Sequence, residues 1–191
     1  LLFLKYLKKK KIIKKIYFQN EIGTANAIKY KFSKLNCKRK LNINSNDFVI
    51  LVYGSIRENK CLKDLFCVTK LLYRENFRIK LIIAGQQDKD TKKSIDKFRK
   101  QNQNIKKNII IFNEFIDDKK ENILFGAANL TWIGYSKSFY GSSGVLFLSS
   151  QNHVPVIGSE HGLLGHQIKN FKIGFTSNLE DHNQTKNKIK K

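Results

Sequence analysis

Short apolar runs rich in β-branched residues alternate with helix-like segments through most of the 191-residue chain, and this alternation constrains the fold more than any other feature. The first run, FVILVY at 48–53, ends at Gly54 and is typical of a strand buried on both faces of a parallel sheet. The segment 61–73 has apolar residues at helical spacing. Further strands are predicted at 80–85, 108–112, 130–134, 154–158 and 172–176, with helices at 91–103, 119–129, from the GSSG turn to about 152, and 161–170.

This order of elements predicts right-handed βαβ units on a parallel sheet. The expected fold class is α/β, a Rossmann-like open parallel sheet with helices on both faces. We expect residues 1–46 to be the trailing end of a preceding domain plus a basic linker, 47–177 the Rossmann-like domain, and 178–191 a polar, frayed tail. Because the chain contains no Met and opens with LLFLKYLKKKK, we also expect a fragment whose N-terminal half is largely missing.

The formal net charge of +22 raises the question of a polyanionic partner. Nucleic-acid readers depend on Arg for bidentate contacts, but only five of the 37 basic residues here are Arg. The Lys and Asn excess is spread along the whole chain. These features favour a solvated basic surface with no specific nucleic-acid partner, and leave a basic polyanion-binding domain as an alternative.

The cysteines Cys37, Cys61 and Cys67 are odd in number and lack CxxC spacing, which indicates a reducing, cytoplasmic setting. The opening apolar run is too short to span a membrane and lacks the order of a signal peptide. The run KKKKIIKK reads as a solvated face, or alternatively as a peripheral contact with anionic lipid head groups.

No metal site is expected, because the histidines do not pair with carboxylates at ligand spacing on a clear helix face. The chain has four of them: His153, His161, His166 and His182.

Three predicted loops follow strand ends and should lie on one edge of the sheet, where open α/β sheets bind ligands. They are GSIRENK (54–60), GYSKSFYGSSG (134–144) and GSEHGLLG (158–165). Together they offer cationic side chains and glycine-rich helix starts, which suit a diphosphate because the first N–H groups of a helix are unpaired and attract anions. The candidate ligand-binding residues are Gly54, Arg57, Lys60, Tyr140, Gly141, Ser142, Ser143, Gly144 and Gly162.

Each of these features also has a plain structural explanation. A Gly-Ser turn before a helix is an ordinary N-cap, with Ser142 or Ser143 as the capping residue. In so lysine-rich a chain, Lys60 could simply be a surface residue. His161 lies within the third loop and His166 directly follows it, and both could be surface or capping residues. Trp132 is expected in the core.

From Phe48 to Thr176 the chain resembles the nucleotide-binding C-terminal domain of GT-B glycosyltransferases, specifically the family 4 (glycosyl transferases group 1) enzymes that use sugar nucleotides. The similar segments are VYGSIRENKCLKDL, LIIAG, ENILFGAANLTWIGYS and GSSGVLFLSSQNHVPVIGSEHGLLGHQI. The spacing from Gly141 through Pro155, the one proline, to Gly162 matches the family without gaps.

The resemblance implies a hexosyltransferase-type enzyme that transfers a sugar from a nucleotide-diphosphate donor to a glycan or lipid-linked acceptor, with no cofactor and no metal. Lys60 and Arg57 would hold the diphosphate, and the loop from Gly141 to Gly144 would cover it. No catalytic residue is assigned.

The chain also departs from the family's pattern. Tyr140 and Leu148 stand where many members have glutamates, which bind the donor sugar and ribose, and Cys61 stands where the family usually has glycine. Ser55 replaces a common arginine, and His166 an acidic residue. A degenerate or truncated, non-catalytic binding module is therefore the main alternative.

Overall fold

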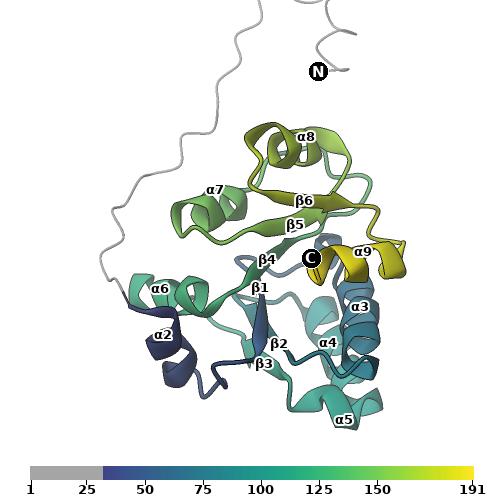
Figure 1. Ribbon diagram of the computed structural model, residues 1–191. Helices are drawn as coiled ribbons and strands as arrows, with labels where there is room; N and C mark the ends of the chain where they lie inside the picture. Colours follow the sequence, from purple (N-terminus) through teal and green to yellow (C-terminus); the bar gives the residue numbers. More distant parts are fainter. Residues whose placement is uncertain (1–31) are drawn as a thin grey trace, which may run out of the picture.

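One parallel sheet runs through residues 32–191, the part of the chain that this computed structural model describes. Its strand order is β3-β2-β1-β4-β5-β6, and every neighbouring pair of strands is parallel. Figure 1 shows helices on both sides of this sheet, which confirms the predicted α/β class and its open parallel sheet. The strands are β1 (Phe48–Tyr53), β2 (Ile79–Ala84), β3 (Ile109–Phe112), β4 (Leu130–Ile133), β5 (Val156–Ser159) and β6 (Gly174–Ser177).

The helices alternate with the strands as the periodicity predicts. A short 3-10 turn, η1 (Glu58–Lys60), comes directly before the long helix that follows β1. The α-helices of the described part are α2 (Lys34–Lys40), α3 (Leu62–Arg74), α4 (Lys89–Gln101), α5 (Gln103–Lys106), α6 (Asp118–Ala127), α7 (Gly144–Gln151), α8 (Gly162–Phe171) and α9 (His182–Ile189).

Buried strands place alternate side chains in two separate cores. In β1, Ile50 and Val52 face a core built with α3, α4, α5 and α9, whereas Val49 and Leu51 face a core built with α6, α7 and α8. All four side chains are fully buried. A strand covered on both faces must be apolar at successive positions, which is why FVILVY reads as a continuous hydrophobic run.

The two ends of the described part differ from the sequence-based prediction. Residues 1–46 are predicted to be the trailing end of a preceding domain plus a basic linker, but residues 34–40 of this segment form α2, which packs on α6. The predicted frayed tail is wrong, because residues 182–189 form α9, which packs on α3. Leu179 and Ile189 are each only 6% exposed, so two apolar side chains anchor an otherwise polar segment. The predictions for residues 1–31 lie outside the described residues.

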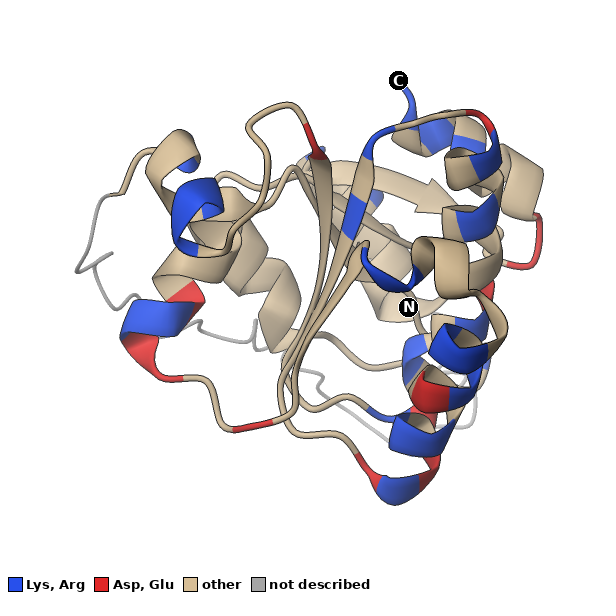
Figure 2. Ribbon diagram, turned by 90° about the horizontal axis from the view of Figure 1, so that it is seen from below, with Lys and Arg blue, Asp and Glu red and all other residues tan. Residues whose placement is uncertain are grey.

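Positive charge gathers on the helices of one face of the sheet. Figure 2 looks along the sheet and shows many more Lys and Arg residues on the helices of one side than on those of the other. The segment KDTKKSIDKFRKQ of α4 illustrates this, with six basic and two acidic residues. Among residues 32–191, no helix combines the length and the apolar character needed to cross a membrane.

Candidate functional site

The site lies where the strand order reverses, between β1 and β4. These strands are neighbours in the sheet although β2 and β3 separate them in the chain. Connections leave such a pair in opposite directions, which opens a crevice at the carboxyl ends of the strands where ligands bind. The β1–α3 loop and the β4–α7 loop flank this crevice.

The three predicted loops are joined by hydrogen bonds. The Ser136 N–H donates to the Asn59 carbonyl at 3.0 Å, which links the β1–α3 and β4–α7 loops. His161 Nε2 lies 2.9 Å from the Ser136 carbonyl, and the Leu163 N–H lies 3.4 Å from the Tyr140 carbonyl. The structure therefore brings the three loops together at one edge of the sheet, as the topology predicts.

Lys60 is buried at the centre of this arrangement. It is 4% exposed, and its ammonium donates to the Tyr53 carbonyl at 3.3 Å and to the Tyr135 hydroxyl at 3.0 Å. It also lies 4.8 Å from the centre of the Tyr135 ring. Both hydrogen-bond acceptors are neutral, and no carboxylate forms an ion pair with Lys60 within residues 32–191. The surface-lysine interpretation is therefore wrong for this residue.

The helix that follows the GSSG turn begins without a side-chain cap. Ser143 occupies the N-cap position of α7, but its hydroxyl makes no capping hydrogen bond. It lies instead 3.2 Å from the Tyr135 hydroxyl, and Ser143 is 4% exposed. The Ser142 hydroxyl donates to Gln167 Oε1 of α8 at 3.1 Å. Neither serine side chain of the turn caps α7. The Leu146 N–H donates to the Ser143 carbonyl at 2.9 Å, which leaves the N–H groups of Gly144 and Val145 for an outside acceptor.

The glycines of the site have different roles. Gly54 has φ 91° and Gly162 has φ 68°, conformations that side-chain-bearing residues rarely adopt. A Cβ at Gly162 would also come within 3.1 Å of the Phe139 carbonyl oxygen, and one at Gly141 within 3.2 Å of the Phe139 ring. A Cβ at Gly144, in contrast, would meet no atom within 4 Å, so the first turn of α7 has open space beside it.

The remaining predicted residues are exposed at the border of the site. Arg57 donates to the Ser55 hydroxyl at 3.1 Å, and Tyr140 is 72% exposed. Arg57 lines a cavity of about 710 Å³ between the starts of α3 and α4. Tyr140 lines a second cavity, of about 460 Å³, together with Glu160 and His161. Lys60 and Ser143 line neither cavity, so these hollows lie beside the buried pair rather than over it.

The candidate residues predicted from the sequence omit two that contact Lys60, namely Tyr135 of the 134–144 loop and Trp132 of β4. Tyr135, two residues after β4, joins Lys60 to Ser143 through its hydroxyl. Trp132 is fully buried, as predicted, but its indole N–H also donates to the Lys60 carbonyl at 3.0 Å. The apolar strand pattern predicts that Trp132 is buried, and Tyr135 lies in a predicted loop. Neither pattern reveals a contact with a lysine 72 to 75 residues away in the chain.

Cys61, which stands where the resemblance implies a glycine, has φ 49° and ψ 41°. Burial, and then the nearby Asp64 and Glu180 carboxylates, raise the pKa of its thiol to about 11. The raised pKa disfavours the thiolate, which is the nucleophilic form of cysteine. Burial and the hydrogen bond to Glu121 at 2.5 Å likewise raise the pKa of the Tyr53 hydroxyl.

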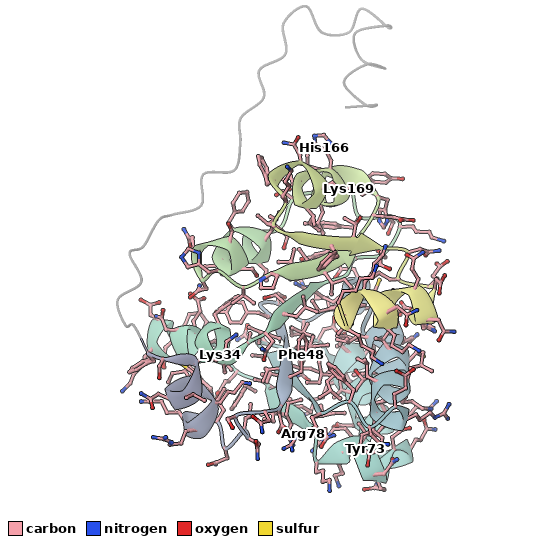
Figure 3. The ribbon with its side chains drawn as sticks, in the orientation of Figure 1. Lys34, Phe48, Tyr73, Arg78, His166 and Lys169 are labelled. Carbon is pink, nitrogen blue, oxygen red and sulfur yellow. The ribbon has the colours of Figure 1, made fainter. Side chains whose placement is uncertain are left out.

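Other candidates lie away from the crevice or have partners of their own. Glu114, which follows the predicted strand 108–112 and could reach the crevice from there, forms an ion pair with Lys120. His166 is exposed on the outer side of α8, at the upper edge of the molecule in Figure 3. No group of three or more His, Cys, Asp or Glu side chains that could hold a metal ion occurs within residues 32–191.

The fold and the site together define a Rossmann-like domain with a buried cation and an uncapped helix start at its topological switch point. Several solved glycosyltransferase structures share this fold. WaaG, a glycosyltransferase involved in lipopolysaccharide biosynthesis, is 16% identical with a TM-score of 0.66, over 83% of this chain and 42% of its own. The C-terminal domain of the group 1 family protein LpcC from Francisella tularensis is 18% identical with a TM-score of 0.66, over 83% and 80% of the two chains.

Anabaena HepE in complex with UDP-glucose is 14% identical with a TM-score of 0.67, over 82% of this chain and 42% of its own. No curated protein matches the chain in sequence. The family model "Glycosyl transferases group 1" matches residues 33–191. The chain therefore belongs to the glycosyl transferases group 1 family, and it spans about two fifths of the length of WaaG and HepE.

Proposed function

We propose that this chain is the donor-binding domain of a family 4-like GT-B glycosyltransferase that moves a hexose from a nucleotide-diphosphate sugar to a glycan or lipid-linked acceptor. The observation that carries the proposal is the pairing of a buried, uncompensated Lys60 ammonium with the uncapped start of α7. Burying a charge without an opposite charge costs several kcal/mol, so a ligand that brings negative charge to this place gains a strong interaction. HepE, which shares the fold, was solved with UDP-glucose.

In the proposed complex, the diphosphate lies over the first turn of α7. Lys60 and the first N–H groups of α7 bind its oxygens, the Ser143 hydroxyl donates to it, and the exposed Arg57 turns in from the border of the crevice. The open space beside Gly144 leaves room for a phosphate close to the backbone. The substrate is the sugar nucleotide itself, with no cofactor and no metal. The proposed setting is cytoplasmic, and peripheral contact with a membrane is an additional proposal.

Titration of the full chain with UDP, GDP and ADP by calorimetry tests this proposal. We expect at least one nucleotide to bind, and Lys60→Ala and Ser143→Ala each to weaken it by about tenfold or more, because each removes a hydrogen bond to a charged group. Lys93→Ala, which removes an exposed lysine of α4, is the matched control and should bind like the parent. Equal affinities for the parent and for Lys60→Ala would contradict the site.

Gly144→Ala separates binding from folding in the same titration. Apart from the neighbouring backbone of α7 itself, the added methyl group meets no protein atom within 4 Å, so the melting temperature should be unchanged. The methyl group would occupy the space proposed for the phosphate, and nucleotide affinity should fall. If this variant binds as tightly as the parent, the diphosphate does not lie on the first turn of α7.

A non-catalytic binding module is the second candidate. Neither Tyr140, which is 72% exposed, nor Leu148 on α7 supplies the carboxylate that many family members have at these two positions. Nucleotide binding by the full chain without hydrolysis or transfer of the sugar from any sugar nucleotide would favour this candidate.

A further inference from the structure

Tyr135 lies between the two side chains proposed to hold the diphosphate. Its hydroxyl accepts from the Lys60 ammonium at 3.0 Å and lies 3.2 Å from the Ser143 hydroxyl. All three residues are more than nine-tenths buried, with exposed fractions of 4% for Lys60, 8% for Tyr135 and 4% for Ser143. These contacts run from the β1–α3 loop to the N-cap of α7 through one phenolic oxygen.

The hydrogen-bond donors of Lys60, Tyr135 and Ser143 do not all have acceptors. An ammonium carries three N–H donors, and the structure gives Lys60 two acceptors, the Tyr53 carbonyl and the Tyr135 hydroxyl. Between Tyr135 and Ser143 one hydroxyl donates and the other accepts, so the second hydroxyl proton has no acceptor in the described residues. The hydrogen-bonded series Lys60–Tyr135–Ser143 therefore reaches the start of α7 with one hydroxyl proton free to bind a further acceptor.

The ring of Tyr135 is fixed independently of its hydroxyl. It stacks on Phe139 with ring centroids 4.0 Å apart and an interplanar angle of 16°. Its backbone N–H donates to the Ser159 hydroxyl oxygen at 2.8 Å, and that hydroxyl donates to the Tyr135 carbonyl at 2.7 Å. These contacts of the ring and the backbone fix the position of the hydroxyl, and they would remain in a variant that lacks the hydroxyl.

We propose that Tyr135 is a positioning residue for the donor diphosphate. Its hydroxyl aims the Lys60 ammonium and the Ser143 hydroxyl at the same phosphate group, so the cation and the helix start bind as one unit. The proposal rests on the proposed function. Hydrogen bonds in such a series polarise one another, so the contact with Lys60 also makes the terminal hydroxyl a better donor to an anion. A tyrosine that only filled the core would need its ring but not its hydroxyl.

The test compares Tyr135→Phe with the parent, using the full chain and the nucleotide that the parent binds among UDP, GDP and ADP. We expect Tyr135→Phe to bind the nucleoside diphosphate about tenfold more weakly. It should bind the corresponding nucleoside unchanged, because the nucleoside has no phosphate to contact Lys60. In a Lys60→Ala background the same substitution should have no further effect, since the residues act as a unit.

Tyr73→Phe is the matched control. Tyr73 lies near the end of α3, roughly 16 Å along the helix from its start beside Lys60, at 1.5 Å per residue. Figure 3 places it beside Arg78, at the opposite end of the molecule from His166. Its affinity for the diphosphate should equal that of the parent.

A spectroscopic measurement reports on Lys60 without any ligand. In protein labelled with ¹⁵N-lysine, the buried Lys60 ammonium should give a slowly exchanging Nζ signal that is absent in Lys60→Ala. Tyr135→Phe should shift this signal or broaden it, and Tyr73→Phe should not.

The outcomes are distinguishable. If the parent binds none of the nucleotides, the proposed function fails and this inference fails with it. If the parent binds but Tyr135→Phe binds equally well, or loses nucleoside and diphosphate affinity alike, the positioning role is wrong while the donor site remains. An additive loss in the double variant would also overturn it.

Discussion

The cysteine that follows Lys60 has φ 49° and ψ 41°, left-handed values that glycine adopts most easily. The conformation turns the chain from η1 into α3 and leaves Lys60 pointing inward to Tyr53 and Tyr135. The glycine that the family resemblance implies at this position is therefore explained by the backbone. Residue type alone could not show that the conformation persists when cysteine replaces glycine.

The three cysteines of the described part should differ in their rates of alkylation. The pKa of the Cys61 thiol is raised to about 11, so almost no reactive thiolate is present at pH 8, and Cys37 is fully buried with a raised pKa as well. Cys67 is exposed. We expect iodoacetamide at pH 8 to modify Cys67 first, as read by peptide mass spectrometry. Modification of Cys61 at the same rate would contradict its burial.

Gly162 and Gly144 form a matched pair for a stability measurement. Gly162→Ala should destabilise the protein by about 1–2 kcal/mol, because alanine must adopt a left-handed conformation there. Its Cβ would also press on the Phe139 carbonyl oxygen at 3.1 Å. Gly144→Ala, which meets open space, should leave stability within about 0.5 kcal/mol of the parent. Denaturant titration measures both, and equal stabilities would show that the Gly162 conformation is not required.

At the scale of elements, α9 shows that a segment of polar composition can still form a helix that packs on the core. The segment from 178 to 191 reads as a tail because few of its residues are apolar. Its attachment depends on Leu179 and Ile189, which enter the core, and on lysines that reach Glu75 at the end of α3. Contacts between residues more than 100 positions apart, such as Lys186 with Glu75, leave no local periodic signal.

The α3–α9 contact should weaken in acid. Hydrogen bonds from Lys186 and Lys190 lower the pKa of Glu75 from 4.5 to about 2. A group with a depressed folded-state pKa stabilises the fold fully above its unfolded pKa, and this contribution disappears as the pH falls through the folded value. The melting temperature of Glu75→Gln should therefore lie slightly below that of the parent at pH 7, and the gap should close between about pH 4.5 and pH 2. A gap that stays constant over this range would contradict the ion pairs.

The positions of the strands along the chain were the most predictable part of the molecule. FVILVY coincides with β1, and each of the other predicted strands overlaps an observed one, because double-sided burial makes the whole strand apolar. The site was predictable only in part. The βαβ topology placed the three loops together, but the contacts of Lys60 with Tyr135 and Trp132 join residues 72 to 75 positions apart, which no local pattern reveals.

For the whole molecule, the net charge of +22 predicts weak and unspecific attraction to polyanions. Within residues 32–191, the helices of one face of the sheet carry more Lys and Arg than those of the other (Figure 2). We expect duplex DNA of unrelated sequences to bind with equal affinity at 50 mM salt, and binding to fall by about 10³-fold or more by 200 mM. Fluorescence anisotropy measures this, and a sequence preference that survives at 200 mM would support the polyanion-binding alternative.

The position of the site at the junction of β1 and β4 also bears on how the protein folds. Strands β1 to β3 are joined by local crossovers, as are β4 to β6, so each half of the sheet can form from contacts of short sequence separation. Lys60 and Tyr135, 75 residues apart, meet only after the two halves have docked. A nucleotide bound there would stabilise the docked state alone, and would slow amide hydrogen exchange in both halves of the sheet together.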